Sequence, residues 1–213
     1  ENVRENWRRL GAAAGLDLTR AVYAKQVHSA DVRIAHAADA QPPEHEPRFT
    51  CDGFVTNEPD VPLAVFMADC LPALLHDPAA GVIGAVHCGW RGSVADILGA
   101  AVAQMCALGA HPADIRAAIG PGIGACCFEV GPEVVAAAEA LLHEPLGALV
   151  RPTAGDRALL DLKRVNALRL TQLGIPAEQI AVSDACTMCR PDVFWSHRAT
   201  DGRRGVQAAV ITL

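Results

Sequence analysis

The sequence lacks the features that would place it in a membrane or on a nucleic acid. No apolar run among its 213 residues approaches the roughly 18 residues of a membrane span, and no secretion-signal pattern opens the chain. Lysine occurs only at positions 25 and 163, and the formal net charge is -6, which argues against a broad nucleic-acid-binding surface. Internal repeats and low-complexity segments are absent too. We therefore expect neither a membrane nor a nucleic acid as partner.

Two phosphate-binding signatures are also missing. Neither GxGxxG nor the P-loop pattern occurs, so neither a dinucleotide nor a nucleoside triphosphate is indicated. A Gly-Pro-Gly-x-Gly sequence does occur at 120–124, and it lets backbone amides approach a phosphate or another segment of the chain. With 51% hydrophobic and 20% charged residues, the composition is that of a folded globular protein. We predict one domain of mixed strands and helices over residues 1–213.

Disulfide bonds are not expected, although the chain has eight cysteines. Most of them lie in apolar runs, in a chain too large to need covalent stapling, which favours a reducing compartment and predicts a cytoplasmic protein. A zinc ribbon needs two Cys-x-x-Cys knuckles, and only Cys186-x-x-Cys189 is present. Half a ribbon completed by Cys126 and Cys127, or a redox pair, is the alternative. We predict that these four thiols are structural and carry neither a metal nor a disulfide.

Apolar patterns predict the main elements. Short apolar runs at 63–67, 71–76 and 81–86, bounded by Pro, Asp and Gly, are typical of buried strands. From Ser93 the spacing becomes helical, with Ser93 and Asp96 as a capping box and Gly109 ending the helix. Residues 39–48 and 144–157 are predicted as loops. The other predicted elements are helices at 1–15, 131–142 and 161–173, and strands at 21–27, 32–35, 49–56, 115–119, 180–182 and 205–213.

Three potential metal ligands end or follow predicted strands: His28, Cys70 and His87. Their wide spacing rules out one helix, so they would come from neighbouring strand ends at a sheet edge. Imidazole and thiolate are strong zinc ligands, and a catalytic zinc keeps three protein ligands with the fourth position open. The alternative is two histidines at the edge of the core and one buried cysteine.

Arg91 is the candidate anion-binding residue. It lies in Gly89-Trp90-Arg91-Gly92, between a predicted strand and a helix start, where free amides and the helix dipole favour an anion. Its guanidinium adds a bidentate fork for phosphate or carboxylate. The alternative is a surface arginine, free or paired with a nearby aspartate.

Six motifs resemble those of the YfiH-like family, long labelled multicopper polyphenol oxidases or laccase-domain proteins. In order along the chain they are KQVHSADV, CDGFVT, ADCLPALLHD, HCGWRGSV, IGPGIGACCFEVG and FWSHRATDGRRG. The resemblance implies an α+β fold, a single α/β/β/α layered sandwich with mixed sheets. It also implies a zinc ion held by His28, Cys70 and His87.

Family members are described as purine nucleoside phosphorylases, some of which deaminate adenosine, and the bacterial branch as a peptidoglycan editing factor. The resemblance therefore implies phosphorolysis of adenosine or inosine, with Cys70, His28, His87 and Arg91 as the catalytic residues and nucleoside and phosphate as partners. The zinc would position phosphate or activate water. One alternative is zinc-dependent amide hydrolysis on a muropeptide precursor. Another is a non-catalytic zinc-stabilised binding protein, with Cys88 as a fourth ligand.

The older copper label does not fit the histidine content. A trinuclear cluster with a blue-copper site needs about ten histidines, largely as His-x-His pairs, whereas this chain has eight and no such pair. Copper is therefore not expected. Family members also carry a Gly- and Asn-rich segment ahead of the first predicted helix, so we expect a missing N-terminal segment that adds to the pocket. Finally, Cys88 stands where the family usually has a small residue, beside the predicted metal.

Overall fold

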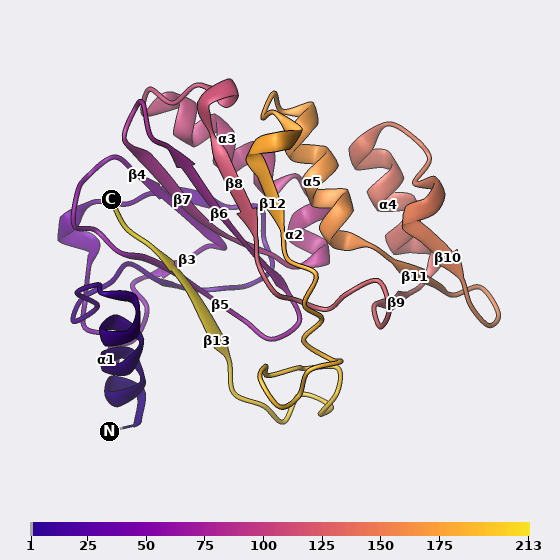
Figure 1. Cartoon of the computed structure of the whole chain (residues 1–213), viewed down its shortest axis with the longest axis horizontal. Helices are drawn as coiled ribbons and strands as arrows, with labels where there is room; N and C mark the ends of the chain where they lie inside the picture. Colours follow the sequence, from indigo (N-terminus) through magenta and orange to yellow (C-terminus); the bar gives the residue numbers. More distant parts are fainter. Residues whose placement is uncertain (1) are drawn as a thin grey trace.

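A six-stranded mixed sheet forms the centre of the molecule, as the computed structural model of residues 2–213 shows (Figure 1). The strand β7 (Val82–Cys88) is buried along its whole length, with antiparallel neighbours on both sides. The apolar runs predicted as strands at 63–67, 71–76 and 81–86 are confirmed with small shifts of their ends. The strand order is β12 (Ile180–Val182), β8 (Arg116–Ile119), β6 (Leu71–Asp77), β7 (Val82–Cys88), β4 (Gly53–Thr56) and β2 (Val32–Ile34).

Smaller sheets lie on one face of the central sheet. β5 (Leu63–Met67) pairs antiparallel with β13 (Gln207–Ile211), and β1 (Ala24–Lys25) pairs parallel with β3 (Phe49–Thr50). Figure 1 shows β5 and β13 running together across the central sheet, with α1 (Asn2–Ala14) beyond them. The predicted strand at 49–56 is therefore two strands, interrupted at Cys51 and Asp52.

Three apolar clusters hold these layers together. The largest lies between the central sheet and the helices α3 (Ile97–Ala107) and α5 (Leu162–Gln172), and it includes Leu75, Ile97 and Met105. A second lies between the central sheet and β5, and a third packs Trp7 of α1 against Tyr23 and Phe66. The order helix, sheet, sheet, helix confirms the predicted α/β/β/α arrangement. No helix among residues 2–213 is both long and apolar enough to cross a membrane.

The predicted helix from Ser93 is instead two helices. α2 (Trp90–Val94) precedes α3, and Asp96 separates them in the left-handed conformation with φ 65°. The Asp96 side chain accepts a hydrogen bond from the Gly99 amide, so Asp96 is the N-cap of α3. The Ser93 hydroxyl is buried without a hydrogen-bond partner in residues 2–213. The capping box predicted from Ser93 and Asp96 is therefore wrong, and Gly109, with φ 100°, follows the end of α3 as predicted.

A side extension carries the remaining elements. α4 (Pro132–Leu142) begins with proline at its first position, and Asp161 caps α5 by accepting from the Arg164 amide. Beside them is a three-stranded sheet of β10 (Val150–Pro152), β11 (Ala158–Leu160) and β9 (Glu129–Val130). The region 144–157, predicted as a loop, contributes β10 to this sheet. Short 3-10 helices complete the chain at Ala37–Asp39, Pro112–Asp114, Gly147–Leu149 and Ala177–Gln179.

Candidate metal centre and its pocket

His28, Cys70 and His87 converge at one end of the central sheet. Their potential ligand atoms all lie within 4.8 Å of one another, and Cys70 Sγ is 3.7 Å from His28 Nε2. Cys70 directly precedes β6, His87 is on β7, and β6 and β7 are paired neighbours. His28 comes from the turn between β1 and β2. The structure thus brings together the three residues that the sequence placed at strand ends.

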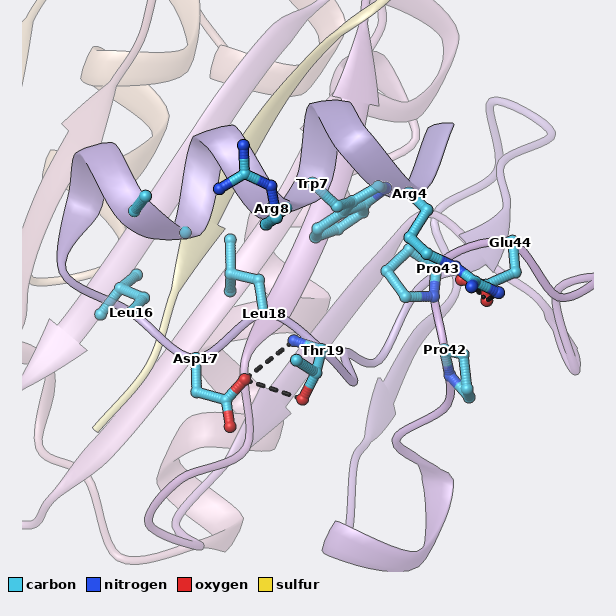
Figure 2. A pocket seen from close by; sticks show the side chains of 12 residues that line it. Arg4, Trp7, Arg8, Leu16, Asp17, Leu18, Thr19, Pro42, Pro43 and Glu44 are labelled. Carbon is cyan, nitrogen blue, oxygen red and sulfur yellow. Dashed lines mark hydrogen bonds and ion pairs between the residues drawn. The ribbon is translucent and has the colours of Figure 1, made fainter. Parts of the chain in front are cut away.

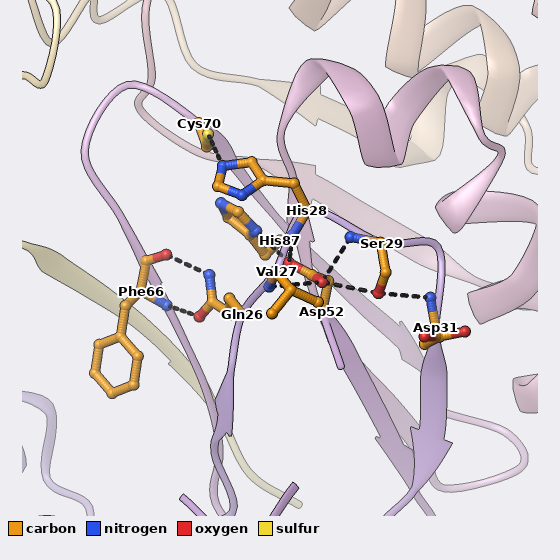
Figure 3. A network of polar contacts seen from close by, with 9 residues as sticks. All are labelled: Gln26, Val27, His28, Ser29, Asp31, Asp52, Phe66, Cys70 and His87. Atoms are coloured by element: carbon orange, nitrogen blue, oxygen red, sulfur yellow. Dashed lines mark hydrogen bonds and ion pairs between the residues drawn. The ribbon is translucent and has the colours of Figure 1, made fainter. Parts of the chain in front are cut away.

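A buried carboxylate organises two of these three residues. Asp52 accepts a hydrogen bond from His87 Nδ1 at 2.8 Å, and both side chains are almost fully buried (Figure 3). The same carboxylate accepts the backbone N–H groups of Val27, His28 and Ser29 at 2.8–3.1 Å. It therefore fixes the turn that presents His28, where φ is 63°, and leaves His87 Nε2 free for the site. A carboxylate behind a histidine in this way is the usual support of a metal ligand.

The ionised forms of Cys70, His87 and Asp52 stabilise one another. Burial alone would raise the pKa of Cys70, but hydrogen bonds from His28 and His87 outweigh it and lower this pKa to about 6. Burial alone would lower the pKa of His87, but Asp52 and Cys70 raise it to about 9. Burial also opposes ionisation of Asp52, yet hydrogen bonds from His87 and the turn amides hold its pKa well below its usual range. A thiolate is thus favoured at Cys70, as metal binding requires.

Gly89 leaves the space that the metal ligands occupy. A Cβ atom at this position would lie 2.7 Å from His28 Cδ2 and 3.2 Å from Cys70 Sγ. The φ of Gly89 is -69°, so its backbone is open to any residue, and only the close approach requires glycine. Gly89, two residues before Arg91, therefore makes room for the candidate metal ligands.

Cys88 does not belong to the metal centre. Successive residues of a strand face opposite sides of the sheet, so Cys88 points away from His87 into the core beneath the helices, where it is 1% exposed. Burial strongly raises the pKa of this thiol. The expectation that Cys88 could be a fourth ligand, closing the site, is wrong.

The three residues open into a cavity of about 520 Å³, a typical size for a small-molecule site. Three arginines line it, Arg91, Arg198 and Arg204, and apolar walls come from Phe66, Ile123 and Phe128 together with Val206. The Arg198 guanidinium lies 5.8 Å from the centre of the Phe128 ring. The pocket therefore combines cationic groups, one apolar wall and a candidate metal centre.

Arg91 is exposed at the rim of this pocket. Its guanidinium lies 4.4 Å from the centre of the Trp90 ring, and no carboxylate among residues 2–213 forms an ion pair with it. The alternative in which Arg91 pairs with a nearby aspartate is thus not seen. The Gly-Pro-Gly-x-Gly loop proves to approach another chain segment, because a Cβ on Gly122 would lie 2.3 Å from Leu71 Cδ2.

Several residues of the site were not predicted from the sequence. Asp52 was not predicted as a site residue, although its carboxylate binds both His87 and the turn that carries His28. Asp69 was interpreted as a strand boundary, yet it accepts from the Thr187 hydroxyl and the Arg198 amide, both at 2.6 Å. Gln26 exchanges two 2.7 Å hydrogen bonds with the Phe66 backbone and joins the His28 turn to β5 (Figure 3). An acidic residue inside an apolar segment was the available signal for Asp52.

Another hollow, of about 610 Å³, lies under α1 and has different chemistry. Figure 2 shows the Trp7, Leu16 and Leu18 side chains along it and Arg4 directed at Glu44, with which it forms an ion pair. The groups of potential metal ligands found in residues 2–213 lie elsewhere. Of these two hollows, the pocket at the strand ends is therefore the one that contains potential metal ligands.

Comparison with known proteins agrees with this architecture. A model of the family described as multi-copper polyphenol oxidoreductase laccase matches residues 1–213. The crystal structure of Bacillus licheniformis hypothetical protein YfiH superposes with a TM-score of 0.90 at 32% identity, covering 99% of this chain and 80% of that one. The chain therefore belongs to this laccase-like family, which includes YfiH.

Curated relatives carry enzyme names. Purine nucleoside phosphorylase YlmD of Geobacillus stearothermophilus is 36% identical over 215 residues, which cover 99% of this chain and 78% of that protein. Adenosine deaminase RL5, from an unknown prokaryotic organism, is 37% identical over 194 residues, covering 89% of this chain and 73% of that protein. The names of these relatives support the interpretation of this chain as an enzyme of the purine nucleoside phosphorylase kind.

Proposed function

We propose that the protein is a zinc-dependent purine nucleoside phosphorylase that converts adenosine or inosine and phosphate into the free base and ribose 1-phosphate. The observation that carries the proposal is the convergence of three potential metal ligands and three arginines on one pocket of nucleoside size. The similarity to YlmD supports the choice of reaction. We further propose a reducing compartment, the cytoplasm, because Cys70 must stay reduced to act as a ligand.

The donor set fits zinc. One thiolate and two imidazoles are ligands that zinc prefers, and the 3.7 Å between Cys70 Sγ and His28 Nε2 is close to the spacing of two ligands on one tetrahedral zinc. The Asp52–His87 hydrogen bond supplies the outer support that such a ligand normally has. When bound, zinc would provide a Lewis acid with an open coordination position.

The arginines are placed to hold the attacking phosphate. Arg91 offers a planar pair of donors that no carboxylate in the described chain engages, and Arg198 and Arg204 line the same cavity. In phosphorolysis an oxygen of phosphate bonds to C1′ of the ribose while the bond from C1′ to the purine nitrogen breaks. The purine leaves with the electron pair and takes up a proton. Arg91 thus orients the nucleophile and compensates its charge.

The apolar wall suits the purine. Phe128 and Ile123 come from the loop after β8, and Phe66 comes from β5, so the flat base would lie between two layers of the fold. Aromatic faces bind purines by stacking, with edge groups left for hydrogen bonding. We therefore expect the sugar to lie toward Arg91 and His28, at the polar end of the pocket.

Hydrolytic deamination of adenosine is a second candidate for the same pocket. It is favoured by the similarity to adenosine deaminase RL5 and by the three-residue ligand set, which leaves one coordination position for water. The deaminated product, inosine, would itself be a substrate for phosphorolysis. Both reactions would depend on Cys70, whereas only phosphorolysis would depend on phosphate.

A matched pair of cysteine variants tests the proposal. Cys70→Ser should abolish base release from inosine in the presence of phosphate and remove the zinc held by His28 and His87. Cys106→Ser changes an exposed cysteine on α3 far from the ligands and should leave both unchanged. Full turnover in folded Cys70→Ser protein would contradict the proposal.

A further inference from the structure

Four cysteines, which the sequence predicts to be structural thiols without a metal, meet at one place. The sulfur atoms of Cys126, Cys127, Cys186 and Cys189 all lie within 4.8 Å of one another. Cys189 Sγ is 3.5 Å from Cys126 Sγ and 3.4 Å from Cys127 Sγ. Cys186 and Cys127 lie in or against the largest apolar cluster, but Cys126 and Cys189 are exposed, so the apolar surroundings expected from the sequence hold for only two of the four thiols.

We propose that these four cysteines bind a second, structural zinc ion. Zinc bound by four thiolates at about 2.3 Å in a tetrahedron places neighbouring sulfurs about 3.8 Å apart, close to the distances around Cys189. A disulfide would join only two sulfurs, whereas Cys189 approaches two others equally. Four protein ligands leave no open position, which makes the site structural. Binding would release the protons of the four thiols to solvent.

The backbone around the cluster is arranged as in a metal knuckle. Each cysteine pair lies in a turn, and the two turns are joined by the bridge between Gly122 and Cys186. The Gly124 amide donates to Cys186 Sγ at 3.2 Å, a contact that stabilises a thiolate. The second half of the ribbon, which a search for Cys-x-x-Cys does not find, is thus supplied by the adjacent pair Cys126-Cys127.

Lys163 supplies positive charge beside the cluster. Lys163 is 5% exposed, and its Nζ donates to the carbonyls of Ser183 and Ala185, in the segment that leads into Cys186. Among residues 2–213 no carboxylate forms an ion pair with it. A zinc ion with four thiolates carries a net charge of -2, so it would compensate this buried ammonium.

The proposed zinc would hold the far wall of the pocket. One turn continues into Phe128, and Thr187, next to Cys186, donates to Asp69 at 2.6 Å. Asp69 directly precedes Cys70 and also accepts the Arg198 amide. The four-cysteine cluster therefore joins the loops that carry Phe128 and Arg198, without depending on the reaction proposed above.

Zinc content of matched variants tests the proposal. The wild-type chain, purified with reductant and without chelator, is loaded with Zn²⁺, desalted and analysed for zinc by mass spectrometry. We expect about two zinc ions per chain in the wild type and in Cys106→Ser. We expect about one zinc ion per chain in Cys189→Ser and in Cys70→Ser. A wild type that keeps a single zinc, lost in Cys70→Ser but retained in Cys189→Ser, would overturn the proposal. So would a wild-type mass two hydrogens below that of the reduced chain.

X-ray absorption spectroscopy of Cys70→Ser protein gives a second test, which does not require Cys189→Ser to fold. The zinc that remains in Cys70→Ser protein should be surrounded by four sulfurs at about 2.3 Å. Nitrogen or oxygen neighbours at about 2.0–2.1 Å in place of sulfur would overturn the proposal.

Discussion

Asp52 accepts a hydrogen bond from His87 at 2.8 Å in the interior of the protein, and its two oxygens also bind the turn that carries His28. One carboxylate thus positions two of the three potential metal ligands, which come from segments far apart in the sequence. Cys70 is the third, and it depends on both histidines for its low pKa. The positions of His28 and His87 therefore depend on Asp52, which lies on the side of these residues away from the pocket.

Asp52→Asn should weaken zinc binding about 10–100-fold, the usual effect of losing a carboxylate behind a metal-bound histidine. The amide keeps the shape of the side chain but removes the charge that raises the pKa of His87. Competition with a chelator of known affinity measures the change. Asp31→Asn, at an exposed neighbouring carboxylate, is the control. Equal zinc affinity in wild type and Asp52→Asn would show that Asp52 does not support the metal centre.

Gly89→Ala should displace the ligands without straining the backbone. The added methyl group would lie 2.7 Å from His28, and a ligand shift of about 1 Å costs on the order of 100-fold in turnover. Zinc retention should fall together with turnover, since the methyl group also meets Cys70. Turnover and zinc analysis on the same sample measure both. Wild-type values for both would mean that the two ligands have room to move.

Arg91→Ala should weaken the use of phosphate at least about tenfold. Charge-assisted hydrogen bonds are worth on the order of 1.5–3 kcal/mol each, and no carboxylate among residues 2–213 forms an ion pair with this guanidinium. Arg91→Lys should recover only part of the loss, because an ammonium is a point charge where a planar fork is needed. Nucleoside cleavage measured against phosphate concentration gives the effect. Arg164→Ala, exposed on α5, is the control, and a phosphate dependence equal to the control would remove Arg91 from the site.

Asp77 makes stability sensitive to acid at the opposite end of β6. Burial would raise its pKa, but the backbone amides of Ala80, His111 and Ala79 outweigh burial and lower it. A folded-state pKa below the unfolded-state value stabilises the protein above about pH 4, and this contribution is lost as the pH falls through the folded-state pKa.

Asp77→Asn should therefore lower the free energy of unfolding by about 1–3 kcal/mol at pH 7. The difference from wild type should shrink as the pH falls below about 4, because the unfolded chain then takes up a proton at Asp77. Denaturant titrations at pH 7 and pH 3 measure it, with Asp114→Asn, at an exposed carboxylate, as the control. A difference that stays constant between pH 7 and pH 3 would argue against an ionised Asp77.

The sequence predicted those parts of the fold that depend on local apolar patterns. The strands around Cys70 and His87 and the helices α4 and α5 were found because burial imposes a regular spacing on their residues. The helix start at Ser93 was wrong because tertiary contacts decided it: Asp96 pairs with Arg169 of α5 at 2.7 Å and caps α3. The strands β9–β11 were missed because they are two or three residues long.

The sequence predicted those site residues whose side-chain type by itself indicates metal binding. His28, Cys70 and His87 are unusual residues at strand ends, so they stood out. Asp52 did not, because an Asp before Gly is typical of turns and its partner His87 lies 35 positions away. The grouping of the four cysteines was only an alternative in the sequence, since Cys126 and Cys189 are 63 positions apart and meet only in the folded chain.

The central claim, phosphorolysis in the pocket beside His28, Cys70 and His87, is tested most directly by the product formed from inosine. Zinc-loaded protein is incubated with inosine and phosphate, and ribose 1-phosphate is followed by phosphorus NMR alongside release of the base. We predict equal amounts of ribose 1-phosphate and hypoxanthine, with no base release when phosphate is omitted. Free ribose in place of ribose 1-phosphate, or base release that does not depend on phosphate, would contradict it.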